Sequence, residues 1–171
     1  MKRGEFWIAY VLLLVAQLLL SNYFHVTPYI FLTILPVMVL CIPIRVGTAG
    51  AMLIACLTGL TVDYLSEGVL GLNALALLPV AYARNGIIGL VFGRELFARK
   101  EDFSVERCGF GKVAMALLMA TTLFLVIYIW ADGAGTRPLW FNALRVAASL
   151  GASFVVSLLT LGVLAPDPRN K

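Results

Sequence analysis

The stretch Thr58-Gly59-Leu60-Thr61-Val62-Asp63-Tyr64-Leu65-Ser66-Glu67-Gly68-Val69-Leu70-Gly71-Leu72-Asn73-Ala74-Leu75-Ala76 lies between two long apolar runs, residues 46–62 and 72–92. Asp63 and Glu67 are the only acidic residues between Glu5 and Glu95. Gly68 and Gly71 allow a tight reversal of the backbone. The pattern predicts a helix end, a short turn and a helix start at one membrane face. Asn73 is expected to satisfy free N–H groups at the start of the second helix.

The composition indicates an all-α membrane protein. Of the 171 residues, 61% are hydrophobic and 13% are charged, whereas soluble domains have about 25% charged residues. A membrane span needs roughly 20 apolar residues. The chain is therefore predicted to form a single domain, residues 1–171, of six transmembrane helices over residues 6–24, 29–44, 46–65, 72–92, 113–131 and 139–164, with a cytoplasmic loop at 94–112.

The basic residues predict the orientation of these spans. With both termini in the cytoplasm, only Arg84, Arg137 and Arg145 fall away from the inner face, as the positive-inside rule requires. The net charge of +4 is explained by the remaining basic residues beside the membrane lipids. Because no basic face is interleaved with aromatic residues, no nucleic-acid partner is predicted.

The second predicted span, residues 29–44, contains Pro36 and is flanked by Pro28 and Pro43. Proline removes a backbone donor and kinks a helix, and the carbonyls that are freed must find partners inside the protein. This span is expected to be bent or broken and packed inside the bundle. The break either forms part of a substrate site, as in transporters, or only fits the bundle. Gln17, in the first span, is expected to face another helix.

Charged groups inside predicted spans are functional hypotheses by default. At 1.5 Å per helical residue, Asp63 and Arg145 lie at similar depths near the outer face, and Arg84 lies several turns deeper beside Asn85. We expect Asp63 to pair with Arg145 and join the third and sixth spans. Pairing of Asp63 with Arg84 would require an unwound segment. The remaining alternative is that Asp63 is an interfacial cap near the outer turn.

Two sets of small residues recur every four positions, which places each set on one helix face. Such stripes allow close helix packing in lipid, and they would receive an internal helix or a partner protein. The sets are Ala51, Ala55 and Gly59 in the third span, and Ser149, Ser153 and Ser157 in the sixth.

The sequence contains no recognisable catalytic or metal-binding pattern. The three cysteines, Cys41, Cys56 and Cys108, lack metal or disulfide spacing. His25 is the only histidine and is expected to be an interfacial loop residue, the alternatives being a proton relay or a metal ligand. Acid–base catalysis needs a second titratable group within reach. We therefore predict no enzyme activity, no metal and no cofactor.

The quoted stretch resembles the central signature of the rod shape-determining protein MreD family. The resemblance rests on Gly59-Leu60, Asp63, Gly71-Leu72 and Ala74-Leu75-Ala76. Residues 27–32 and Leu35-Pro36 also resemble the second segment of MreD proteins, especially those of Bacteroidetes type. The resemblance implies a scaffold in the bacterial inner membrane that supports cell shape and wall elongation. The implied partners are a bitopic MreC-like protein, the actin-like MreB, a RodA-type glycosyltransferase and an elongation transpeptidase.

The resemblance also leaves a second function open. MreD-like proteins resemble the substrate-binding subunits of energy-coupling factor vitamin transporters, which are also six-helix proteins. In that case, Asp63, Arg84 and Asn85 would line a cavity for a small molecule. The short outer loops disfavour this alternative because they offer little to close over a pocket.

Overall fold

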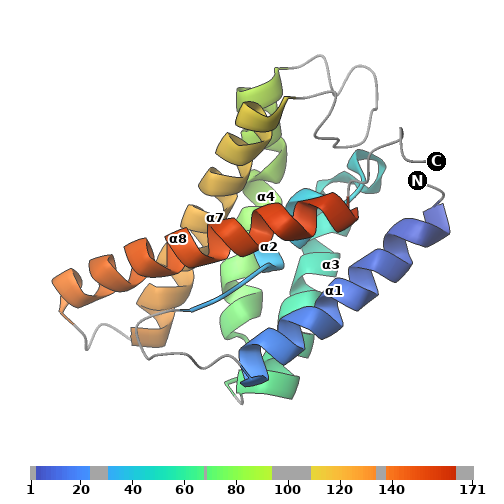
Figure 1. Cartoon of the computed structure of the whole chain (residues 1–171). Helices are drawn as coiled ribbons and strands as arrows, with labels where there is room; N and C mark the ends of the chain where they lie inside the picture. Colours follow the sequence, from blue (N-terminus) through green and yellow to red (C-terminus); the bar gives the residue numbers. More distant parts are fainter. Residues whose placement is uncertain (1–2, 24–30, 68, 94–108, 134–137, 165–171) are drawn as a thin grey trace.

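The computed structural model describes residues 3–23, 31–67, 69–93, 109–133 and 138–164. Every regular element in this described part is helical (Figure 1). The elements are α1 (Arg3–Tyr23), α2 (Leu35–Leu40), the 3₁₀ turn η1 (Ile44–Val46), α3 (Gly47–Val62), the π-helical turn η2 (Asp63–Glu67), α4 (Leu72–Phe92), α7 (Phe110–Gly133) and α8 (Leu139–Leu164).

Four helical stretches are long and apolar enough to cross a membrane. They are Gly47–Ser66, Leu72–Phe92, Phe110–Gly133 and Leu139–Thr160. In α1 the apolar part, Phe6–Asn22, is shorter. The protein thus has an all-α fold of the membrane type, and six uninterrupted spans are not what the described residues form.

The prediction of a helix over residues 29–44 is wrong for its described part. Residues 31–34 form neither helix nor strand, with Ile34 at φ −109° and ψ 0°, and the helix α2 that follows has only six residues, all of them buried. Pro36 lies within the first two positions of α2, where a missing N–H is tolerated. The chain then turns at residues 41–43 and enters η1. The expected break at the prolines is therefore present, and it is more complete than a kink.

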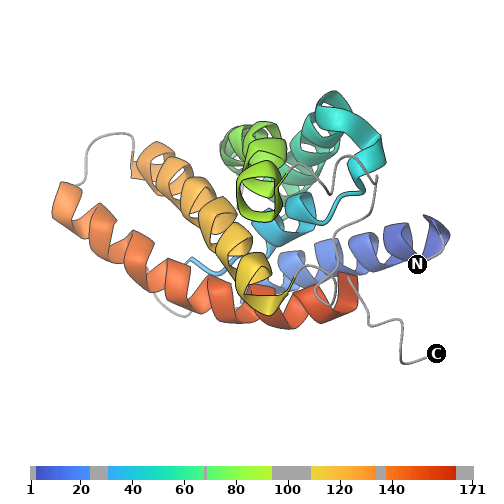
Figure 2. The ribbon, with the colours of Figure 1, turned by 90° about the horizontal axis from the view of Figure 1, so that it is seen from above.

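The helices α3, α4 and α7 run alternately up and down beside one another, and α1 and α8 cross them at a steep angle (Figures 1 and 2). The starts of α1, α3 and α7 and the ends of α4 and α8 lie at the same side of the molecule (Figure 1). The short helix α2 lies in the middle, with contacts to α1, α3, α4, α7 and α8. Its six side chains form the centre of the apolar core.

The helices α3 and α4 approach each other closely at Gly59. A Cβ atom on Gly59 would lie 2.5 Å from the backbone N and Cα atoms of Ala74, so only glycine fits. Ala51 and Ala55, on the same stripe as Gly59, are also fully buried. The small-residue stripe of α3 therefore faces the inside of the protein. At the turn into α4, Gly71 has a φ of 97°, a conformation that glycine adopts without strain.

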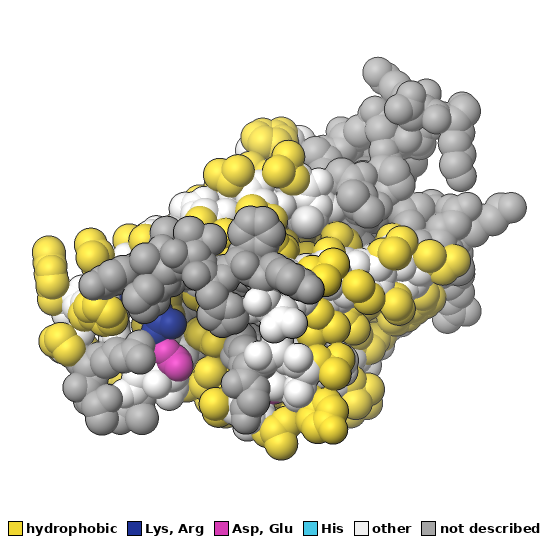
Figure 3. Space-filling view, turned by 60° about the horizontal axis from the view of Figure 1, so that its bottom comes forward, with side chains coloured by type: hydrophobic (Ala, Val, Ile, Leu, Met, Phe, Trp, Pro, Cys, Tyr) yellow, Lys and Arg dark blue, Asp and Glu magenta, His cyan; other side chains and the backbone are white. Residues whose placement is uncertain are grey.

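Many large apolar side chains of the described residues are exposed on the surface. Figure 3 shows hydrophobic side chains over most of the described part of one face, interrupted by a basic and an acidic side chain in contact. The helix α8 is the least enclosed candidate span, with 17% of its most apolar window buried. Exposed side chains of this kind are compatible with a surface that contacts lipid.

Candidate functional site

The carboxylate of Asp63 binds the start of α4. Asp63 is fully buried in the first turn of η2. Its Oδ2 accepts hydrogen bonds from the backbone N–H groups of Gly71 (2.9 Å) and Ala74 (3.4 Å). Its Oδ1 accepts from the backbone N–H of Asn73 and from the Asn73 side-chain amide, both at 2.9 Å. One carboxylate from the end of α3 thus satisfies three of the free N–H groups at the N-terminus of α4.

This arrangement corrects two predictions. Asn73 does not cap α4 with its own oxygen; its side-chain amide donates to Asp63, and the N-cap residue is Gly71. Asp63 does not pair with Arg145 or with Arg84. The alternative reading, in which Asp63 is a cap, is the one that the geometry supports. The charge of Asp63 is offset by backbone N–H dipoles rather than by a cation. The depth of a residue along its helix does not distinguish these two kinds of partner.

Arg84 binds the other end of the broken segment. Its side chain is 1% exposed in the middle of α4. Its Nε donates to the carbonyl oxygen of Leu40 (3.2 Å), and its Nη2 donates to that of Ile42. Leu40 is the last residue of α2 and Ile42 lies two residues beyond it, at the end of the helix where a cation is favoured by the helix dipole. Asn85, next in the chain, donates from its amide to Thr48 Oγ1 at 2.7 Å and so links α4 to α3. Backbone carbonyls thus supply hydrogen-bond acceptors for the buried Arg84 side chain.

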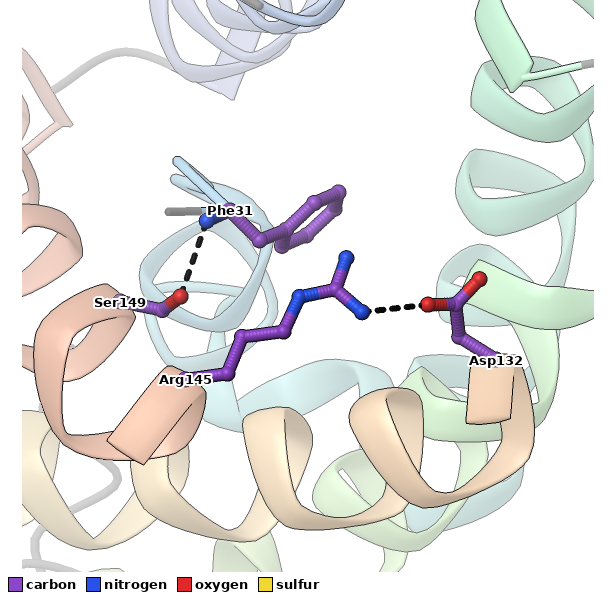
Figure 4. A network of polar contacts seen from close by, with 4 residues as sticks. All are labelled: Phe31, Asp132, Arg145 and Ser149. Atoms are coloured by element: carbon purple, nitrogen blue, oxygen red, sulfur yellow. Dashed lines mark hydrogen bonds and ion pairs between the residues drawn. The ribbon is translucent and has the colours of Figure 1, made fainter. Parts of the chain in front are cut away.

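Arg145 forms an ion pair within the hairpin of α7 and α8. Its Nη1 lies 2.5 Å from Asp132 Oδ2, and the two side chains are 12% and 29% exposed, respectively (Figure 4). Asp132 lies in the last turn of α7, one residue beyond the span predicted over residues 113–131. It is the acidic residue nearest in sequence to Arg145, which is the signal that could have identified the pair.

The serine stripe of α8 binds backbone rather than another helix. Ser149 Oγ accepts a hydrogen bond from the Phe31 N–H (2.9 Å), as Figure 4 shows, and Ser153 Oγ accepts one from the Thr33 N–H (3.1 Å). Ser153 also donates to the Phe31 carbonyl oxygen (3.1 Å). On the opposite side, Gln17 Oε1 of α1 accepts from the Ile34 N–H (2.8 Å). The non-helical residues 31–34 are therefore held by side chains of α1 and α8.

These contacts explain why polar residues interrupt the two outermost helices. Residues 31–34 lie outside any helix, and in lipid the N–H groups of such a segment need protein acceptors. Ser149, Ser153 and Gln17 are all fully buried. They supply the acceptors for the N–H groups of Phe31, Thr33 and Ile34. The serine spacing predicts a surface for an internal helix or a partner protein, but the stripe binds the non-helical backbone of residues 31 and 33, which the sequence pattern does not reveal.

A shallow apolar groove of about 180 Å³ lies between α7 and α8. Its lining is Val126, Ile129, Trp130, Leu139, Asn142, Ala143 and Val146. Asp63, Arg84 and Asn85 are not among these residues. Among the described residues, no group of three or more His, Cys, Asp or Glu side chains is placed to bind a metal ion. Gly68, His25, Cys108 and residues 94–108 lie outside the described part.

The helical fold and the buried, hydrogen-bonded polar side chains define a class of protein. It is an all-helical protein of the multi-pass membrane type, whose helices are linked by those side chains. No protein-family model, curated protein or solved structure matches the chain.

Proposed function

We propose that the protein is a non-enzymatic scaffold of the cell-wall elongation machinery in the bacterial inner membrane, as its resemblance to the MreD family implies. The proposal has both termini in the cytoplasm, because the basic residues then gather at the inner face. Its partners would be the MreC-like protein, MreB, the RodA-type glycosyltransferase and the elongation transpeptidase. It would act by binding them through helix faces and short loops.

The observation that carries this proposal is that the buried polar side chains form hydrogen bonds within the protein. Asp63, Arg84 and Asn85 each bond to another part of the same chain and stabilise it. A substrate-binding subunit of a transporter would instead direct such groups into a shared cavity with polar ligands. The groove between α7 and α8 is almost wholly apolar and does not include these three residues.

A binding role also fits the exposed face of α8. This helix is 26 residues long, and its most apolar window is the least buried of the four candidate spans. Ala147 and Gly151 are exposed on it, and a Cβ atom on Gly151 would meet no atom within 4 Å. Small residues on an outward face allow another transmembrane helix to approach closely. We assign this face to a membrane partner.

The test is affinity purification of the tagged protein from membranes in mild detergent, followed by identification of co-purified membrane proteins. Wall-elongation proteins are expected, and Gly151→Leu is expected to reduce their recovery at least fivefold without lowering the amount of folded protein. Gly86→Leu, at an exposed glycine of α4 with equally open surroundings, is the matched control. Recovery of an ATP-binding-cassette transporter module, with no wall-elongation protein, would refute the proposal in favour of the vitamin-carrier alternative.

A further inference from the structure

The serine stripe of α8 continues one position beyond the contacts that hold residues 31–34. Ser149 and Ser153 bind the N–H groups of Phe31 and Thr33. Ser157, one turn further along the same face, is also fully buried, and its Oγ has no hydrogen-bond partner. A buried hydroxyl without a partner is unfavourable by about 1–3 kcal/mol, so its presence requires an explanation.

The spacing of the stripe matches that of an extended chain. Four residues of an α-helix rise about 6.0 Å, and two residues of an extended strand rise about 6.6 Å. Successive serines of the stripe can therefore bind alternate N–H groups of an extended segment, and Ser149 and Ser153 bind those of residues 31 and 33. Counting on by two residues from Thr33, the N–H that corresponds to Ser157 is that of Leu35.

Leu35 is held differently in this structure. It is the first residue of α2, and its N–H donates to Thr33 Oγ1 at 3.2 Å. The residue that precedes a proline is disfavoured in the helical conformation and favoured in the extended one. Since Pro36 follows, Leu35 has a local preference for the conformation that would bring its N–H to Ser157.

We propose that residues 31–35 have a second hydrogen-bond register, in which Ile34 moves from its ψ of 0° to an extended conformation and the Leu35 N–H donates to Ser157 Oγ. In this register the first helical hydrogen bond of α2, from the Met38 N–H to the Ile34 carbonyl oxygen (3.2 Å), is lost. The far end of α2 stays bound to Arg84. The first turn of α2 thus acts as a hinge. When it opens, α2 becomes shorter, and Ser149 and Ser153 of α8 keep their hydrogen bonds to residues 31 and 33.

The first test is a double-mutant cycle on the full chain, with unfolding followed in mixed micelles. Ser157→Ala alone is expected to change the folding equilibrium constant less than twofold, because Ser157 has no partner in the main register. Thr33→Val alone is expected to lower it two- to threefold, because Leu35 can transfer its N–H to Ser157. With both changes the N–H has no acceptor, and the loss is expected to exceed the product of the single losses about tenfold or more.

The control pair is Thr33→Val with Ser149→Ala. Ser149 binds a different N–H, so the losses in this pair are expected to multiply without excess. If Thr33→Val and Ser157→Ala also combine as a simple product, the second register does not exist.

The second test needs only the wild-type protein and Ser157→Ala. Hydrogen exchange at the Met38 amide reports opening of the first turn of α2. In the proposed mechanism Ser157 stabilises the opened form, so exchange in Ser157→Ala is expected to be about fivefold slower. Equal exchange rates in the two proteins would overturn the proposal, whatever the outcome of the first test.

Discussion

Replacement of Asp63 should destabilise the protein more than any other single change between residues 58 and 76. Its carboxylate accepts four hydrogen bonds, three of them from backbone N–H groups at the start of α4. Asp63→Ala leaves four donors without this acceptor, of which three are buried and the Gly71 N–H is part-buried, and each buried donor left unsatisfied costs about 1–3 kcal/mol. Since some donors can shift to other acceptors, we expect a loss of about 4 kcal/mol in the free energy of unfolding.

Asp63→Asn should give an intermediate loss of about 2 kcal/mol, because the amide keeps one acceptor oxygen and loses the negative charge at the helix N-terminus. The measurement is equilibrium unfolding by SDS in mixed micelles, followed by circular dichroism. Thr61→Ala is the matched control, because the Thr61 hydroxyl is partly exposed and binds only the Leu57 carbonyl of its own helix. It should change the free energy by less than about 0.5 kcal/mol.

Wild-type stability in both Asp63 variants would refute the capping role. Asp63→Asn with unchanged stability but lost biological activity would instead indicate a chemical role for the carboxylate, contrary to the scaffold proposal.

The other predictions concern the remaining close contacts and use the same unfolding measurement. Gly59→Ala should lower the free energy of unfolding by about 2 kcal/mol, because the added Cβ would overlap Ala74. Gly86→Ala should not lower it, because no atom lies within 4 Å of the added Cβ. Equal effects of the two changes would contradict the close packing at Gly59. Arg84→Met should cost about 3 kcal/mol by leaving the Leu40 and Ile42 carbonyls unsatisfied, with Arg84→Lys less severe; a neutral Arg84→Met would show that those bonds contribute nothing. Asp132→Arg and Arg145→Asp should each lower the free energy of unfolding by about 1 kcal/mol, and the double variant should regain part of that loss. The double variant Asp63→Arg with Arg145→Asp should regain no stability. If only this second pair regained stability, the predicted pairing of Asp63 with Arg145 would be correct.

The sequence was sufficient to predict the features that depend on composition and on local chemistry. Charged residues are scarce, and apolar runs of membrane length predict the helices α3, α4, α7 and α8. Pro36 predicts the break before the buried helix α2. The turn after Asp63 follows from its glycines and from the polar residues around them. Each of these signals lies within one segment, so it can be read without knowledge of the fold.

The partners of the polar side chains could not be predicted in the same way. Depth and charge favoured Asp63 with Arg145, but depth gives only one coordinate and leaves the direction of a side chain around its helix undetermined. Charge complementarity also overlooks the backbone, which supplies the acceptors for Arg84 and most of the donors for Asp63. The serine stripe shows the same limit, because its spacing fits a smooth helix face and an extended strand equally well.

The way in which α8 is held bears on what the protein can bind. In lipid, apolar side chains gain little by leaving the solvent for another helix, so polar contacts have a large share in fixing where a helix lies. Although few residues of α8 are buried, Ser149, Ser153 and Arg145 attach it to residues 31–34 and to α7. These contacts all use one side of α8. The opposite side, with Ala147 and Gly151, remains smooth and apolar while the helix stays fixed in position. A fixed, exposed helix face lowers the entropy loss when another transmembrane helix docks, which is the property that a membrane scaffold requires.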